Sequence, residues 1–217
     1  MKKSMKLLCL LVGILFAVTA LVVNASAEPK LGTAEAQPKV LENIQLKWLP
    51  TESASSSKGI DLAAFSKARI FVKPFTDLRT NPAEIGTNDE KSGPRLVTTR
   101  DSVADWLTEK FTKVLSATGI RVVTTAAEAT VTIEADITKF YVTEKSRYDA
   151  EVALKVRVMS KNNEVLWAGM TAGSENRLGR SYKANNYSEA LSNASITAIH
   201  ALLKNEDFKQ AVQKGVK

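Results

Sequence analysis

Apolar and polar residues alternate strictly over much of the second half of the chain, and this pattern limits the fold more than any other feature of the sequence. The alternation is clear in 131–138, returns in 149–158, and continues in 165–173 after a turn sequence at 161–164. A period of two places successive side chains on opposite faces of a β-sheet, so we expect one face to be buried and the other to meet solvent or a partner. The phase slips at Lys139, which predicts a β-bulge there.

The segment 102–118 has the period of an amphipathic helix. Ser102 and Asp105 resemble a capping box at its start, and Gly119 is suited to end it. We expect its apolar stripe to be buried. The stripe consists of Val103, Trp106, Leu107, Phe111, Val114 and Leu115.

A second helix is expected over 188–203, where many Ala and Ser residues suit close packing on a sheet. Asn205 is placed to cap a short last helix that carries Phe208 and Val212. The residues expected to face inward in the second helix are Leu191, Ala194, Ala198, Ile199 and Leu202.

Strands are also expected at 43–49 and 68–75, with a short one at 121–124. The polar stretch 76–99 is expected to be a long loop, disordered in preference to the alternative of a functional loop, and 174–187 a second long loop. The predicted fold is α+β: a two-layer sandwich with a mostly antiparallel sheet of about 4–6 strands. Two main helices and a short C-terminal helix are expected to cover one face of this sheet.

Residues 1–27 have the three parts of a secretory signal: early lysines, an apolar run and an A-x-A site. A membrane anchor is the alternative, because the apolar run approaches the roughly 17–25 residues that span a bilayer. We predict cleavage between Ala27 and Glu28, a flexible linker at 28–39 and a single domain at 40–217. The predicted location is the periplasm.

Cys9 is the only cysteine, and it lies too early in the apolar run to be a typical lipid attachment site. Removing residues 1–27 therefore leaves no thiol for a disulfide, a metal site or a nucleophile. The same step removes three Lys and no acid, so the net charge falls from +7 to +4, with 27 bases and 23 acids. This balance suits an anionic envelope surface, and no basic run with stacking aromatics indicates nucleic acid.

No arrangement of residues indicates catalysis, so we predict no enzymatic activity, no metal and no cofactor. His200 is the only histidine, and the sequence has no nucleophile elbow and no metal-ligand spacing. Glu134 and Asp136 are expected on one strand face about 7 Å apart. A carboxylate pair for hydrolysis is one interpretation of them, and ordinary surface charge is the other.

Two groups of residues are candidate ligand-binding positions. Asp77 and Arg79 follow the second strand, where a local ion pair is the alternative interpretation. The other group lies in the 174–187 loop, which we expect to be exposed, and a merely solvated loop is the alternative. Arginine there could bind a phosphate or an acidic glycan bidentately. This group consists of Arg177, Arg180, Tyr182, Lys183 and Tyr187.

From Ala68 onward the sequence resembles the YajG-type bacterial envelope lipoproteins and related small α+β envelope auxiliary proteins. The likeness rests on Asp77-Leu78-Arg79, on the helix at 102–115 followed by Gly119-Ile120, on 131–139 and 148–158, and on 188–208. The resemblance implies an envelope location and no known enzymatic activity. This chain differs in lacking a lipidation cysteine at the end of its signal.

The sequence thus predicts a non-enzymatic periplasmic accessory or binding protein. Its partner would be an envelope protein or an anionic envelope glycan, with no nucleic acid and at most peripheral membrane contact. An alternative is a self-associating structural module in which the sheet face or edge pairs with a second copy. A hydrolase using Glu134 and Asp136 is a third hypothesis.

Overall fold

The computed structural model of the protein describes residues 41–51, 56, 58–90 and 93–217. Chain contacts separate Met1–Gln37 from a compact unit, Pro38–Lys217, and the description below concerns this second unit. The predicted leader 1–27 and linker 28–39 lie outside the described residues.

The sheet is built around one long central strand, β7. On one side of β7, β8 and then β9 pair antiparallel in turn. On the other side, β2, β3 and β4 pair parallel with successive parts of β7, with β6 beyond β2 and β5 and β1 beyond β4. The strands in the described residues are β1 (Leu41–Ile44), β2 (Ile70–Val72), β3 (Thr76–Asp77), β4 (Glu84–Asn88), β5 (Arg95–Thr99), β6 (Val122–Val123), β7 (Val131–Glu144), β8 (Tyr148–Ser160) and β9 (Val165–Arg177).

The α+β class is confirmed, but the predicted sheet is too small and too antiparallel. The described residues form nine strands instead of four to six. The long β7–β8–β9 pairings are antiparallel, whereas most of the short pairings on the other side of β7 are parallel. Strands of two to five residues contain too few side chains to show a period of two, so the sequence did not reveal three of the six short strands: β3, β4 and β5.

The long antiparallel part agrees with the sequence. The register of β7 against β8 shifts between Ile137 and Lys139, so the predicted bulge is confirmed. The turn between β8 and β9 contains Asn163 with a φ of 62°, the left-handed conformation that asparagine tolerates in hairpins.

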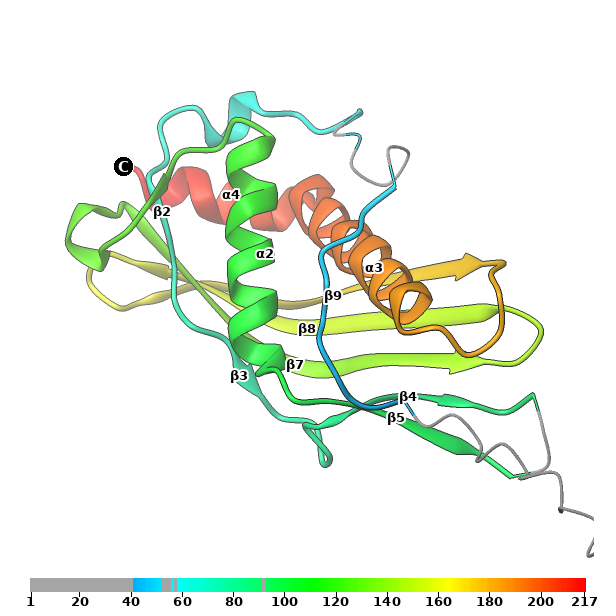
Figure 1. Cartoon of the computed structure of the whole chain (residues 1–217). Coiled ribbons are helices and arrows are strands. Elements are labelled where there is room, and N and C mark those ends of the chain that lie inside the picture. Colours follow the sequence, from blue (N-terminus) through cyan, green and yellow to red (C-terminus); the bar gives the residue numbers. More distant parts are fainter. Residues whose placement is uncertain (1–40, 52–55, 57, 91–92) are drawn as a thin grey trace, which may run out of the picture. The chain divides into compact units, whose positions relative to one another are not determined.

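Three helices in the described residues lie on one face of the sheet (Figure 1): α2 (Val103–Ala117), α3 (Ala184–Lys204) and α4 (Glu206–Lys214). Their predicted caps are present. The Ser102 hydroxyl accepts a 3.2 Å hydrogen bond from Asp105 N, Asn205 caps α4 through Phe208 N, and Gly119 has a φ of 90°. Within the described part of the chain, no helix is both long and apolar enough to cross a bilayer.

The core lies between this helical layer and the sheet. The α2 stripe and every predicted inward residue of α3 are buried. Removing each large apolar side chain from water stabilises the fold by about 1.5–3 kcal/mol. Two short 3₁₀ turns, η1 (Ala63–Phe65) and η2 (Ala126–Glu128), connect other elements.

The expectation of a disordered loop at 76–99 is wrong. This stretch contains β3 and the β4–β5 hairpin, in which Ile85 and Val97 are fully buried. Gly86 permits the packing, because a Cβ there would lie 2.5 Å from Val142 O of β7. Gly86, part of the glycine content that suggested a loop, therefore allows close approach of strands.

Two predicted boundaries also need correction. The first strand ends at Ile44, and residues 45–50 do not pair in the sheet. In the stretch 174–187, β9 continues to Arg177 and α3 begins at Ala184, so only 178–183 connect them. The extension of β9 to Arg177 and of α3 back to Ala184 gave no sequence signal. The added residues of β9 are polar and lie on an exposed strand, and the start of α3 has no cap.

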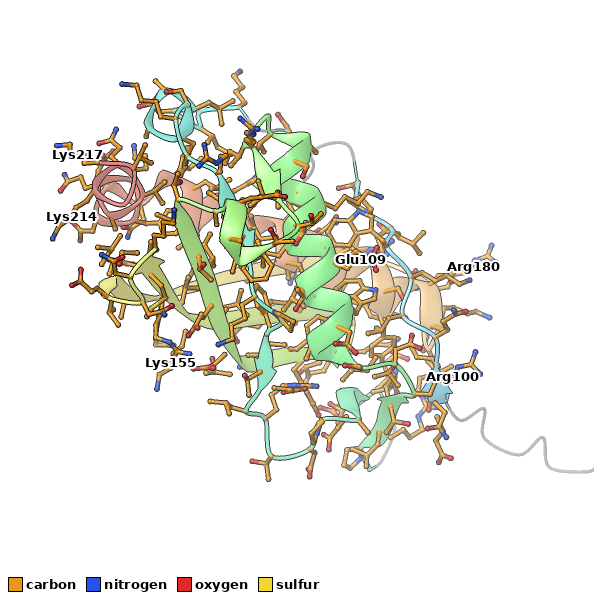
Figure 2. The ribbon with its side chains drawn as sticks, turned by 90° about the vertical axis from the view of Figure 1, so that its left-hand side faces the viewer. Arg100, Glu109, Lys155, Arg180, Lys214 and Lys217 are labelled. Carbon is orange, nitrogen blue, oxygen red and sulfur yellow. The ribbon has the colours of Figure 1, made fainter. Side chains whose placement is uncertain are left out.

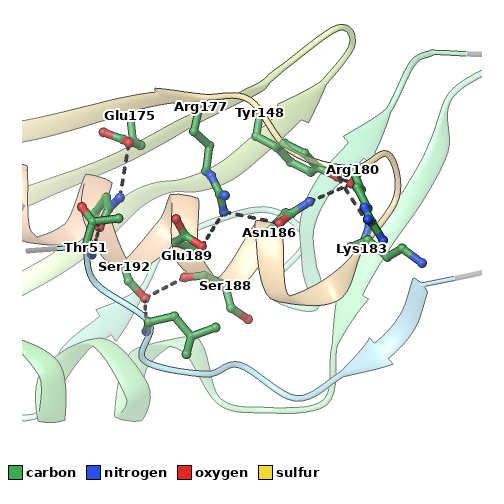
Figure 3. Close-up of polar contacts among 12 residues, drawn as sticks. Thr51, Tyr148, Glu175, Arg177, Arg180, Lys183, Asn186, Ser188, Glu189 and Ser192 are labelled. Carbon is green, nitrogen blue, oxygen red and sulfur yellow. Dashed lines mark hydrogen bonds and ion pairs between the residues drawn. The ribbon is translucent and has the colours of Figure 1, made fainter.

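Residues 45–51 instead form a strap along α3, the helix that follows much later in the chain. Lys47 N donates to Ser188 Oγ at 3.2 Å, and Leu49 N donates to Ser192 Oγ at 3.0 Å. Thr51 N donates to Asn193 Oδ1 at 3.0 Å (Figure 3). These buried side chains of α3 therefore accept hydrogen bonds from backbone N–H groups that have no partner in the sheet.

Candidate functional site

The predicted binding residues fall into two separate places. Asp77 ends β3 and Arg79 follows it, on the β2–β3–β4 side of β7. Arg177 ends β9, on the opposite side of the sheet from β3, and Arg180 follows it in the 178–183 loop. The structure does not bring these two groups together.

Asp77 and Arg79 form the local ion pair, with side chains that are 12% and 8% exposed. The guanidinium has five N–H donors, and all are used. Nε and Nη2 donate to Asp77 at 2.9 and 2.7 Å, and Nη2 also donates to Pro82 O at 2.6 Å. Nη1 donates to Glu84 O at 2.8 Å and to Phe140 O at 3.2 Å. Arg79 thus fills the gap between β3 and β4 and has no donor left for a ligand.

Tyr182 of the 178–183 loop and Tyr187 in the first turn of α3 are both buried, which corrects the expectation that they lie on an exposed loop. Tyr182 is 5% exposed and Tyr187 is fully buried. Both contact Glu144, itself 1% exposed, which accepts from Tyr182 N at 2.7 Å and from the Tyr187 hydroxyl at 2.6 Å. The Tyr182 hydroxyl accepts from Leu41 N at 3.0 Å.

These tyrosines anchor the loop. The Tyr148 hydroxyl donates to Arg180 O at 2.7 Å, and Asn186 Nδ2 donates to the same oxygen at 2.7 Å. Burial, followed by hydrogen bonding to Glu144, raises the pKa of Tyr187 well above its ordinary value. Burial raises the pKa of Tyr148 to about 12, so both phenols remain protonated donors at neutral pH.

The anchored loop leaves a basic hollow of about 510 Å³ at the start of α3. Arg177 is held on its wall by an ion pair of 2.7 Å with Glu189 and a 3.4 Å hydrogen bond to Asn186 (Figure 3). Arg180 and Lys183 are exposed, and neither side chain has a partner among the described residues. Figure 2 shows Arg180 projecting away from the protein body. The hollow is lined by Arg177, Gly179, Arg180, Lys183, Ala184, Asn185 and Asn186.

The helix end adds to this positive character. Lys183 is the N-cap residue and makes no side-chain cap, and the first turn of α3 contains no acid. Within the described structure, the backbone N–H groups of Ala184 and Asn185 have no hydrogen-bond acceptor. An α-helix carries partial positive charge at this end, so the hollow is suited to an anion. These amides were not expected from the sequence, because the helical pattern becomes clear only from Ser188.

The possible carboxylate pair is engaged in ion pairs. Arg157 donates to Asp136 at 2.8 Å and to Glu134 at 3.3 Å, and Lys73 donates to Glu134 at 2.8 Å. The hydrogen bond from Lys73 is the main cause of a lowered pKa at Glu134. A carboxyl with a lowered pKa is ionised at neutral pH and is poorly suited to donate a proton as a general acid.

His200 lines a separate hollow of about 210 Å³ between α2, α3 and the strap, beside Trp48 and Lys113. Burial is the main cause of its lowered pKa. Across the described residues, no three His, Cys, Asp or Glu side chains are grouped so that they could hold a metal ion.

The fold and site together define a mixed α+β domain whose anchored loop and helix end form a basic hollow. Residues 66–213 match the model of a family described as an uncharacterized lipoprotein, and the chain belongs to this family. The protein is therefore a cell-envelope protein. No curated protein matches the chain.

Several solved structures are similar in fold. A Xanthomonas campestris protein of the DUF330 family is 11% identical, with 76% of this chain and 88% of that chain covered and a TM-score of 0.47. The PelC dodecamer from Paraburkholderia phytofirmans is 13% identical, covering 63% and 86%, with a TM-score of 0.41. A Neisseria meningitidis lipoprotein is 14% identical, covering 55% and 90%, with a TM-score of 0.34.

Proposed function

We propose that the protein is a non-enzymatic periplasmic binding protein that holds a phosphate or carboxylate group of an envelope glycan in the basic hollow. The observation that carries this proposal is the pair Arg180 and Lys183, which lie exposed and unpaired within the described structure beside the uncapped start of α3. An anion in the hollow would gain charge-assisted hydrogen bonds from these side chains and from backbone amides.

The fixed loop supports this function because a rigid site loses less entropy when it binds. Arg180 O is held by Tyr148 and Asn186, and Tyr182 N is held by Glu144. Arg177 is fixed by Glu189 and would present its charge without reorganisation. The backbone of the site is thus organised before a ligand arrives.

The same proposal includes export of the chain to the periplasm and its release from the membrane by cleavage of the leader. Within the family we group the chain with the YajG-type envelope proteins, as a member without lipid at its N-terminus. Cleavage after Ala27 would leave Glu28 as the first residue and remove Cys9, the only thiol. N-terminal sequencing of the protein from a periplasmic extract should begin at Glu28, with no incorporated fatty acid. A lipid-modified Cys9 would contradict this part of the proposal.

Binding should be tested with phosphorylated and carboxylated oligosaccharides, with neutral oligosaccharides of equal length as the reference. Each charge-assisted hydrogen bond contributes about 1.5–3 kcal/mol, so the double variant Arg180→Ala/Lys183→Ala should bind at least about ten-fold more weakly. The affinity of the unchanged protein should also fall as salt rises.

The matched control is Lys155→Ala/Lys161→Ala, which removes the same charge from exposed positions elsewhere. Figure 2 shows Lys155 far from Arg180. The control should bind like the unchanged protein. Equal losses in the two double variants would show that net charge alone attracts the ligand, and failure to bind any anionic oligosaccharide would refute the proposed site.

A further inference from the structure

The last strand of the sheet, β9, is a long free edge. It spans 13 residues, Val165–Arg177, and pairs only with β8 in the described structure. Its other edge receives no backbone hydrogen bond from any described residue. A free edge presents a row of N–H and C=O groups that can pair with a further strand.

Apart from a register shift against β8 between Val165 and Trp167, this edge lacks the features that usually protect exposed strands. Residues 165–174 contain no charged residue and no proline. Edge strands normally carry charged side chains that prevent pairing with a further strand. Here the charged side chains, Lys155 and Arg157, lie instead on β8, the neighbouring inner strand. The large apolar side chains of Val165, Met170 and Leu178 are exposed on β9 or directly after it.

We propose that β9 pairs antiparallel with β9 of a second copy of this chain, so that one sheet continues across a two-fold axis. An isologous contact of this kind uses the same surface on both copies and closes at a dimer. The outer-face residues that would meet are mostly small, and they alternate along the strand. They are Ala168, Met170, Ala172 and Ser174.

The charge distribution along β9 favours a second copy in this orientation. The only charged residues of the strand are Glu175 and Arg177, both near one end. Parallel pairing in register would place each beside its own copy, and like charges directly opposite are destabilising. Antiparallel pairing sets them against the uncharged beginning of the partner strand. A chain with net positive charge also meets its own copy most easily through an uncharged surface.

The inference is independent of the proposed anion site. Arg177 lies at the end of β9, so pairing would leave one basic hollow at each end of the joined strands. Loss of dimerisation would therefore leave binding of an anionic oligosaccharide in place, and the two ideas can fail separately.

A cysteine scan tests the arrangement. Single cysteines are introduced at Ala168, Met170, Ala172 and Ser174 in a Cys9→Ser background, and the full chain is treated with a short thiol crosslinker. Opposed residues of an antiparallel pair lie about 4.5–5.5 Å apart, so crosslinking should be strongest at the position or positions next to the two-fold axis and should fall with distance from it along the strand. A cysteine at Thr132, on the outer face of the central strand β7, is the control and should give no crosslinked dimer.

A second measurement uses sedimentation of the protein at increasing concentration. The unchanged protein should form a dimer, and Ala172→Lys should weaken dimerisation at least ten-fold, whereas Thr132→Lys should not. Far-UV circular dichroism would verify that both variants are folded. Equal crosslinking at all four positions would refute antiparallel pairing, and a monomer at every concentration would overturn the proposal.

Discussion

The hydroxyl of Tyr187 donates a 2.6 Å hydrogen bond to Glu144 Oε2, and both side chains are buried where β7 ends beside the start of α3. This contact joins the central strand to the main helix. It also holds the base of the loop that carries Arg180, because Glu144 accepts from Tyr182 N with its other oxygen. Both oxygens of the buried carboxylate thus accept hydrogen bonds from one short segment of the chain, Tyr182 to Tyr187.

Replacing Tyr187 by phenylalanine should destabilise the protein by about 1–3 kcal/mol, because it leaves a buried carboxylate oxygen without its donor. Tyr141→Phe is the matched control. Tyr141 also donates to a glutamate, Glu84 at 2.8 Å, but this contact is partly exposed, and water can replace the lost donor. Urea unfolding of both variants measures the difference. Equal losses would contradict the importance of burial at Glu144.

Arg79→Lys should cost about 2–3 kcal/mol, although the charge is kept. A lysine has three donors in place of five and cannot reach Pro82 O, Glu84 O and Phe140 O while also pairing with Asp77. Arg121→Lys, at an exposed arginine, should change the free energy of unfolding by less than about 0.5 kcal/mol. A negligible effect of Arg79→Lys would show that the gap between β3 and β4 tolerates loss of these bonds.

The stability of the protein should fall as the pH drops through about 6.5, the ordinary pKa of histidine. Burial, with a smaller contribution from Lys204, lowers the pKa of His200 in the folded protein. The unfolded chain therefore binds a proton at a pH where the folded chain does not, and protonation favours unfolding. The loss should be complete once the pH is below the folded-state pKa.

His200→Gln should remove this part of the pH dependence, as measured by thermal unfolding between pH 5 and 8. Because His200 is the only histidine, its titration can be followed directly by NMR in the folded protein. A midpoint at or above the ordinary value would contradict the expected direction.

Gly173→Ala should destabilise the protein by about 3 kcal/mol. A Cβ at this position of β9 would overlap Ala194 O and Ala198 N in the backbone of α3, which cannot move without lifting the helix from the sheet. Gly119→Ala is a useful comparison because its Cβ would meet open space and only the positive φ opposes it, at roughly 1–2 kcal/mol. The reverse order of stabilities would argue against close packing of α3 on β9.

The parts of the fold that sequence analysis predicted are those with a long periodic signal. The 14 residues of β7 and the 15 of α2 show their periods clearly, and the slip at Lys139 marked the bulge. By contrast, β4 has a single large apolar residue, Ile85, and its glycine suggested a loop. Short parallel strands depend on a distant partner, here β7, that a local pattern cannot reveal.

The candidate site was predicted only in part. Arg177 and Arg180 line the same hollow, as their closeness in sequence suggests. The burial of Tyr182 and Tyr187 depends on Glu144, which lies about forty residues earlier and reads as an ordinary strand-end acid. The free amides of α3 could not be predicted either, since an uncapped helix start has no sequence signature.

The strap at 45–51 has a consequence for when the chain can fold. Its backbone N–H groups donate hydrogen bonds to Ser188, Ser192 and Asn193, which are 141 to 143 positions later in the sequence. The backbone N–H groups of Lys47, Leu49 and Thr51 therefore have no acceptors on α3 until almost the entire polypeptide has been synthesised. Residues 47–51 can thus dock only after β1 already has its partner strand β5 within reach.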